Sequence, residues 1–230
     1  WDLMFACKRL GGNDFLSLAL RLAGPHSAPQ SPVPWIIQVR LSRTTSDNVA
    51  GSGELGNVTP AIIIPGDWSQ EDLAYQAENL VSWIISNASA ACNTPRVIIL
   101  HTEWPQREAF LEALRRVYAG TPLRCAFYPG SQQRYQAFLD AHPNAEPIGT
   151  PAEGELPWTL IPDVSSENRE DICFTAESFC SVAAVTPISA PDVPEYLERA
   201  VAFANQTLWG TLAAGVFVHP ASMRSPQIKA

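Results

Sequence analysis

From residue 54 onward, hydrophobic and polar positions follow two alternating rhythms. Short apolar runs, AIII at 61–64 and VIILH at 97–101, have the length of buried strands. Apolar residues at helical spacing over about 70–85 and 105–118 predict amphipathic helices beside these strands. The alternation continues with strands expected near 124–128, 158–161, 182–186 and 212–218, and with helices over about 132–141 and 193–205. This pattern predicts an α/β fold, a three-layer domain with a largely parallel sheet flanked by helices on both faces.

Two of the expected helices begin with residues that suit a helix start. Ser69 with Asp72 three residues later resembles a capping box in which Asp replaces Glu. Pro105 fits a first helical turn, where its missing N–H leaves no hydrogen bond unmade. These residues place the two starts near 70 and 105.

The first 53 residues differ in composition from the rest of the chain. Pro, Ser, Thr and Gly dominate from 24 to 53, interrupted only by the strand-like WIIQVRL at 35–41. This segment carries five basic and three acidic residues, whereas the remainder is strongly acidic. We therefore divide the chain into an unassigned N-terminal segment and boundary, 1–53, and a domain over 54–230.

Charge and composition exclude several classes of function. A net charge of −8 and a pI near 5.0 argue against nucleic acid as a partner. Because no apolar stretch reaches about eighteen residues, no membrane partner is expected. Five cysteines without zinc-site spacing predict reduced thiols, no metal site and a soluble cytoplasmic protein. The chain opens at Trp1 without a signal-peptide cleavage site, which favours a processed or truncated fragment.

Four segments carry the candidate chemistry, and they stand in a recognisable order. They are ELGNVTPAIIIPGDW at 54–68, SNASAACNTPRVIIL at 86–100, TAESFCSVAAVTPI at 175–188 and AFANQTLWGTLAAGVF at 202–217. These segments resemble the motifs ELGGxxPxIV, NxGQxCxxxxRVxV, ExFGPVxxV and ANxTxYGLAAxVF of the aldehyde dehydrogenase superfamily. The resemblance is to the catalytic, C-terminal domain of a divergent bacterial-like branch.

The resemblance implies a role for four residues. It places Cys92 on the thiol nucleophile and Glu54 on the carboxylate that activates water. It places Glu177 on the carboxylate that contacts the nicotinamide ribose and Phe179 on the aromatic beside it. The implied activity is NAD(P)-dependent oxidation of an aldehyde to an acid through a cysteine thioester. The implied partners are an aldehyde and, in the complete protein, a second copy of the chain in a homo-oligomer.

Each of these residues also has an ordinary structural interpretation. Outside its motif, Cys92 would be a small buried hydrophobe, Glu54 a solvated loop carboxylate and Glu177 a surface carboxylate at a strand edge. The remaining cysteines are expected in the core, with Cys180 near the ribose-binding carboxylate.

Departures from the family pattern keep two other hypotheses open. Asn57 replaces the second Gly of the glutamate motif, the Gln of the nucleophile motif is absent, and Cys180 follows the aromatic in place of Gly. These changes favour a non-catalytic module with the same fold. A cofactor-free cysteine esterase is the third hypothesis, because a thiol and a carboxylate suffice for ester turnover.

The dinucleotide-binding part of the family is not recognisable in this chain. Residues 1–53 hold no Gly-rich turn opening a helix, which is the feature that binds a pyrophosphate. We therefore expect an incomplete enzyme that binds NAD or NADP weakly or not at all by itself.

Overall fold

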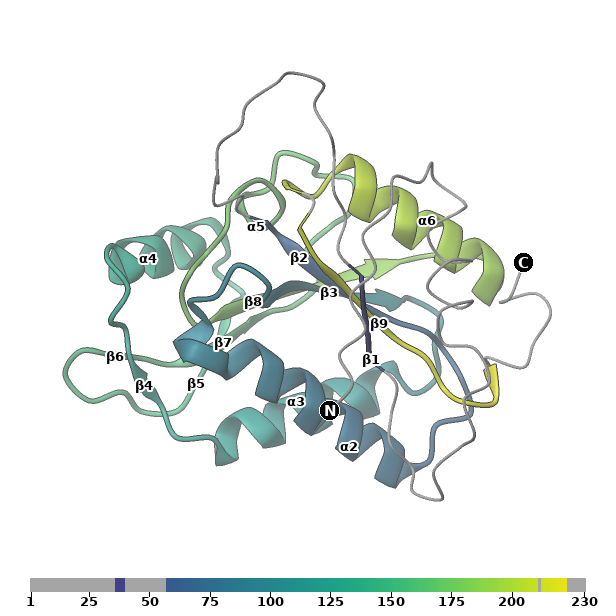
Figure 1. The fold of residues 1–230 in the computed structure, drawn as a ribbon, viewed down its shortest axis with the longest axis horizontal. Helices are drawn as coiled ribbons and strands as arrows, with labels where there is room; N and C mark the ends of the chain where they lie inside the picture. The colour runs from purple at the N-terminus through teal and green to yellow at the C-terminus, as the bar shows by residue number, and fades with distance from the viewer. Residues whose placement is uncertain (1–35, 40–56, 211, 223–230) are drawn as a thin grey trace.

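A seven-stranded sheet forms the centre of the computed structural model, which describes residues 36–39, 57–210 and 212–222 (Figure 1). Its five inner strands run parallel, and one antiparallel strand pairs at each end. The strand order is β1 (Ile36–Val39), β9 (Ala214–Phe217), β2 (Thr59–Ile63), β3 (Pro95–His101), β8 (Val182–Ile188), β7 (Trp158–Ile161) and β5 (Glu146–Ile148). The predicted α/β fold with a largely parallel sheet is confirmed.

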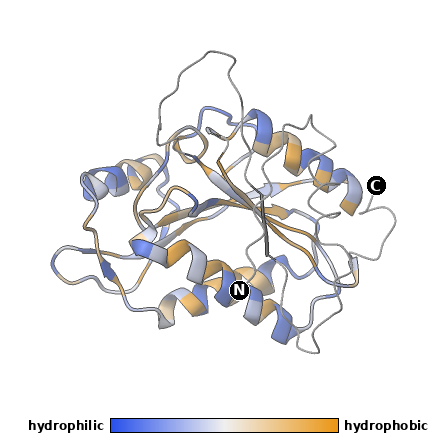
Figure 2. Ribbon diagram, in the orientation of Figure 1, coloured by the Kyte–Doolittle hydropathy of each residue, from blue (hydrophilic) through white to orange (hydrophobic). Residues whose placement is uncertain are grey.

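Helices cover both faces of the sheet. One face carries α2 (Gln70–Ile85) and α3 (Arg107–Gly120); the other carries α4 (Ser131–Ala141), α5 (Ile172–Thr175) and α6 (Val193–Gln206) (Figure 1). Successive strand residues point to opposite faces, so Ile62 packs under α6 whereas Ile63 packs under α2. Figure 2 shows the resulting stripes of hydrophobic and hydrophilic residues on the helices. Each face therefore has its own apolar core, and the two cores share the strands between them.

Side-chain caps fix where the helices begin. Ser69 Oγ accepts a hydrogen bond from the Asp72 backbone N–H at 3.0 Å, and Asp72 Oδ2 accepts one from Ser69 N at 3.1 Å. This is the predicted capping box. At α6, Asp192 accepts from the Glu195 N–H at 2.9 Å. Helix α3 begins at Arg107, two residues after the predicted Pro105.

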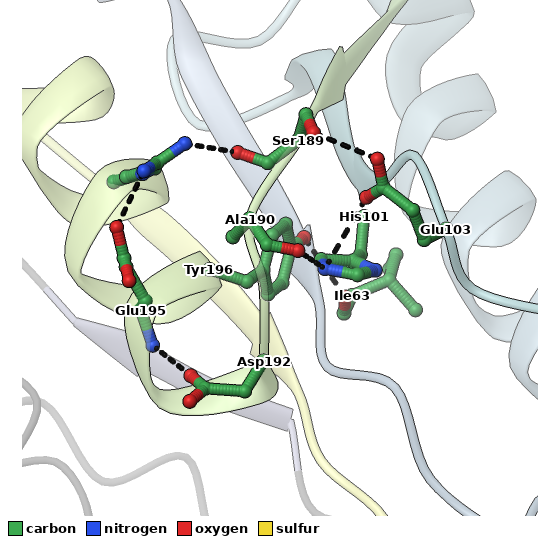
Figure 3. Close-up of polar contacts among 9 residues, drawn as sticks. Ile63, His101, Glu103, Ser189, Ala190, Asp192, Glu195 and Tyr196 are labelled. Carbon is green, nitrogen blue, oxygen red and sulfur yellow. Dashed lines mark hydrogen bonds and ion pairs between the residues drawn. The ribbon is translucent and has the colours of Figure 1, made fainter.

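Helix α6 is anchored to the carboxyl end of the sheet by a buried tyrosine (Figure 3). The Tyr196 hydroxyl contacts two strand carbonyl oxygens, that of Ile63 at 3.0 Å and that of Ile99 at 2.9 Å. The His101 ring stands edge-on to the tyrosine ring at 5.0 Å, and its Nε2 lies 3.0 Å from the Ala190 carbonyl oxygen. These contacts join α6 to β2 and β3.

The strand predicted near 124–128 does not belong to the central sheet. Only β4 (Arg124–Cys125) forms there, and it pairs antiparallel with β6 (Glu155–Leu156) in a separate two-stranded ribbon. Both β4 residues are exposed, and Pro129 with Gly130 ends the segment, so it offers no continuous apolar run to bury. The short strand β5, helix α5 and the 3₁₀ turn η1 (Ser86–Ser89) were not predicted.

Strand β1 pairs with β9 and so joins the same sheet as the later elements, although it precedes the expected boundary at 53. The division of the chain at that residue stays a prediction. Within the ranges that the structure describes, no helix is both long and apolar enough to cross a membrane.

Candidate active site

The four motif segments meet at one end of the sheet, where its parallel strands begin. Thr59 of β2 is in register with Pro95 of β3, and Val97 of β3 with Ala184 of β8. The backbone of Asn57 also bridges to Gly210, just before β9. The loops that lead into β2, β3, β8 and β9 therefore lie together at the amino ends of these parallel strands. Glu54 lies three residues before Asn57 and outside the described residues, so its role as the carboxylate that activates water stays a prediction.

Cys92 lies on the loop between η1 and β3, and its side chain is exposed. The interpretation of Cys92 as a buried hydrophobe is therefore wrong. Its carbonyl oxygen accepts a hydrogen bond from Thr59 Oγ1 at 3.4 Å, which ties the loop to the start of β2. Asn57 Nδ2 in turn donates to Thr59 Oγ1 at 2.7 Å and to the Ala213 carbonyl at 3.0 Å. The cysteine is thus presented to solvent from a loop whose backbone is tied to the start of β2.

The turn before Cys92 has an unusual backbone. Asn87, Ala88 and Ser89 have φ values of 53°, 53° and 61°, in the left-handed region that residues other than glycine seldom adopt. Asn87 Nδ2 donates to the Ala90 carbonyl at 2.9 Å, and Ser89 Oγ donates to the Ile84 carbonyl at 2.7 Å. These two side-chain bonds hold the turn in its conformation.

Arg96, in β3, connects the cysteine loop to the Glu177 segment. Its guanidinium donates to the carbonyl oxygens of Ser89, of Ala91 at 3.4 Å, and of Cys180 at 3.3 Å. Burial lowers the pKa of Arg96 to about 10, against the raising influence of Cys180 and Glu177, so the group stays charged at neutral pH. One buried cation therefore fixes two loops that come from distant parts of the sequence.

Glu177 is half-buried at the same edge. Burial raises its pKa, while the charge of Arg96 and a hydrogen bond from the Asn57 backbone N–H act in the opposite direction. Its Oε1 atom is buried and has no hydrogen-bond partner within the described part of the chain. Glu177 is thus only partly exposed, with Oε1 turned away from solvent and the carboxylate near Arg96 of β3 and Asn57, which precedes β2.

Phe179, two residues after Glu177, has a strained backbone conformation. Its φ of 43° is an outlier for a bulky residue. The centroids of the Phe179 and Tyr128 rings lie 4.7 Å apart. The Arg96 guanidinium carbon lies 5.6 Å from the centroid of the Phe179 ring. Ser131 Oγ, at the start of α4, donates to the Phe179 carbonyl at 3.0 Å. Helix α4 therefore helps to position the segment that precedes β8.

The cysteines differ in exposure. Cys180 is buried, as expected, and burial raises its pKa to about 11. Cys173 is also buried, and burial, together with the negative charge of Asp171, raises its pKa further still. Cys125 is exposed on the β4–β6 ribbon, so its assignment to the core was wrong. Cys7 lies outside the described residues.

Arg96 and Thr59 were missed by sequence reasoning. The signal for Arg96 was present, because it is the one charge near the start of a strand whose seven residues are all buried. A buried arginine must find hydrogen-bond acceptors, which marks it as a residue that organises its surroundings. Thr59 gave no such signal, since a hydroxyl is common in strands.

The fold is shared with part of the aldehyde dehydrogenases. Lactaldehyde dehydrogenase from Escherichia coli matches with a TM-score of 0.54 and 16% identity, covering 76% of this chain and 37% of that chain. An oxidoreductase from Marinobacter aquaeolei gives 0.54 and 17%, with 73% and 35% covered. An NAD-dependent aldehyde dehydrogenase from Sinorhizobium meliloti gives 0.51 and 18%, with 65% and 30% covered.

Sequence comparison adds nothing to this likeness. No protein-family model matches the chain, and no curated protein matches it. At these identities the solved structures establish the fold alone, and the chain spans about a third of their length. The aldehyde dehydrogenase-like fold expected from the motifs is confirmed.

Proposed function

We propose that this chain is the catalytic portion of an NAD(P)-dependent aldehyde dehydrogenase, with Cys92 as nucleophile and Glu54 as the base that activates water. The observation that carries the proposal is the set of hydrogen bonds by which Arg96 joins the Cys92 loop to the segment before β8. This residue holds the carbonyls of the exposed Cys92 loop and that of Cys180, directly after the segment bearing Glu177 and Phe179. The shared fold supports the same assignment.

The proposed chemistry has two halves. In the first, the Cys92 thiolate attacks the aldehyde carbon and forms a C–S bond, leaving an oxyanion that backbone N–H groups of the loop can stabilise. Collapse of this oxyanion expels a hydride and leaves a thioester on Cys92. NAD or NADP, when bound, supplies the hydride acceptor. In the second half, Glu54 removes a proton from water, which attacks the thioester, and the acid and the free thiol are released.

The residues present fit the nicotinamide end of the cofactor. Glu177 Oε1 is a buried acceptor without a partner among the described residues, and a ribose hydroxyl is a donor that would satisfy it. Phe179, two residues further on, supplies an apolar ring whose centroid lies 5.6 Å from the Arg96 guanidinium carbon. We assign Glu177 to the ribose and Phe179 to the neighbouring ring contact.

The acyl half-reaction can be tested on this chain without a cofactor. With p-nitrophenyl acetate, we expect a burst of nitrophenolate of up to one equivalent as Cys92 is acylated, followed by slow turnover. Cys92→Ser should abolish the burst. Glu54→Gln should keep the burst and slow the turnover, because the carboxylate acts only on the deacylating water.

NADH formation separates the proposed enzyme from the two alternatives. The full-length protein that contains this chain should produce NADH or NADPH from at least one member of a panel of aliphatic and aromatic aldehydes. A Cys92-dependent burst without NAD(P)H would favour the cysteine esterase. Neither signal, with Cys92 alkylated by iodoacetamide no faster than the exposed Cys125, would favour the non-catalytic module.

A further inference from the structure

Three side chains of different chemistry converge where α4 ends and α5 begins. His142 follows the last residue of α4, Asp171 caps α5, and Cys173 lies within α5. His142 Nε2 is 3.0 Å from Asp171 Oδ1 and 3.4 Å from Cys173 Sγ. The three potential ligand atoms all lie within 4.8 Å of one another. Residues 31 positions apart in the sequence thus point their donor atoms at one place.

Two of the three separations lie in or near the range of a tetrahedral metal site, and the third is at most 4.8 Å. Zinc binds nitrogen, oxygen and sulfur at ~2.0–2.3 Å, which places neighbouring ligand atoms ~3.3–3.8 Å apart. The sulfur-to-nitrogen distance falls in this range, and the nitrogen-to-oxygen distance is slightly shorter. A cation can therefore enter between the three atoms with small side-chain movements.

A hydrolytic Cys-His-Asp relay does not explain the cluster. In such a relay the thiol and the carboxylate contact opposite nitrogens of the imidazole. Here both contact Nε2 of His142. Donors that converge on a common point are instead what a coordination site requires.

The surroundings of the cluster also suit a metal. Asn168 Nδ2 donates to the second oxygen of Asp171 at 3.2 Å, a hydrogen bond that orients the carboxylate from outside the ligand set. Cys173 is buried, whereas the side chains of His142 and Asp171 retain 12% and 10% exposure. Because these two side chains keep some contact with solvent, a water molecule can fill a fourth coordination position.

We propose that His142, Asp171 and Cys173 form a binding site for a divalent cation of the zinc class, which links α4 to α5. The site differs from the sequence-based expectation of no metal site, since its ligands are too widely spaced along the chain to form a motif. Helix α5 leads directly into Glu177, and the Phe174 carbonyl accepts a hydrogen bond from Trp209 N at 2.8 Å. The cation would therefore stabilise a segment that reaches the amino ends of the parallel strands, where Glu177 lies.

Cobalt provides a direct probe of the site. The chain, stripped with a chelator and titrated with Co²⁺ alone, should bind one equivalent and develop a thiolate-to-cobalt charge-transfer band in the near ultraviolet. One equivalent of Zn²⁺ should remove the band and raise the Tm. Absence of the band and of any Zn²⁺-dependent rise in Tm would overturn the proposal.

Variants assign the band to these residues. Cys173→Ser should abolish it, and Cys125→Ser, at an exposed thiol outside the cluster, should leave it unchanged. Asp171→Asn keeps an oxygen to cap α5 but loses the charge, so the Kd for Co²⁺ should rise at least about tenfold. If Cys173→Ser does not fold, Asp171→Asn decides, and an unchanged Kd would contradict the assignment.

Discussion

At the scale of single residues, the turn before Cys92 places three residues other than glycine in the left-handed region of backbone conformation. Asparagine tolerates the left-handed region, and Ser89 gains a buried hydrogen bond there. Ala88 has neither advantage, although its φ is 53°. Ala88→Gly should therefore raise the free energy of unfolding by about 0.5–1 kcal/mol, the relief of strain less the added entropy of the unfolded chain.

The neighbouring alanine is the matched control for this change. Ala90 has a φ of −106°, outside the left-handed region, and its side chain is buried, so Ala90→Gly should lower stability. Urea unfolding of both variants gives the comparison. Two changes of the same sign would show that backbone conformation does not set the outcome.

Glu177 should make stability depend on pH in a definite direction. Because its pKa is raised in the folded state, the folded protein binds more protons than the unfolded chain between the ordinary value of 4.5 and the raised value. The stability that Glu177 contributes is complete below 4.5 and is lost as pH rises through the raised pKa. Glu177→Gln should therefore gain stability relative to the wild type as pH rises from 4 to 7.

Thermal unfolding across this pH range tests the expectation. Glu153→Gln, at an exposed loop position, controls for the same change in net charge. A Glu177→Gln difference that stays constant from pH 4 to pH 7 would contradict the burial of the carboxyl.

At the scale of elements, two buried tyrosines provide a paired test of how helices dock. The Tyr196 hydroxyl contacts carbonyls of β2 and β3, whereas the Tyr118 hydroxyl on α3 has no partner among the described residues. Tyr196→Phe should lower the free energy of unfolding by about 1–2 kcal/mol, because it removes the single hydroxyl proton that the two buried carbonyls share. Tyr118→Phe should be neutral or stabilising. Equal losses in denaturant titrations would mean that the α6 hydrogen bonds contribute nothing beyond packing.

Element prediction succeeded where local chemistry decides structure. The α2 start followed from Ser69 and Asp72, and the buried strands followed from uninterrupted apolar runs. It failed at 124–128, where Phe127 and Tyr128 suggest a strand but stay exposed. Strand β5 was missed because Glu146–Ile148 is short and contains a proline, so its pairing depends on β7 alone.

The site was predictable only as far as its motifs extend. Cys92, Glu177 and Phe179 could be selected as candidates from their motifs in the sequence. The contacts that join them could not, because a hydrogen bond from Arg96 to a carbonyl of residue 180 leaves no trace in residue types. Backbone acceptors are present at every position, so only the folded chain selects among them.

At the scale of the whole molecule, the two cores should unfold together. Ile62 belongs to one core and Ile63 to the other, so neither face can lose its packing while β2 remains ordered. Leu80→Ala, in the fully buried face of α2, should cost about 2–5 kcal/mol. Hydrogen exchange should then accelerate in α6 on the opposite face as much as in α2. Faster exchange confined to α2 and α3 would indicate two independent units.

The short strand β5 has a consequence for how copies of this molecule meet at high concentration. It is one of the two edge strands of the described sheet, and the open edge of such a strand normally offers N–H and C=O groups on which a neighbouring chain can add a further strand. Here Pro147 lacks an N–H, and Glu146 forms an ion pair with Arg115 at 2.8 Å. A three-residue strand with one donor missing and a charged neighbour is a poor template for edge-to-edge aggregation, so this end of the sheet should resist it.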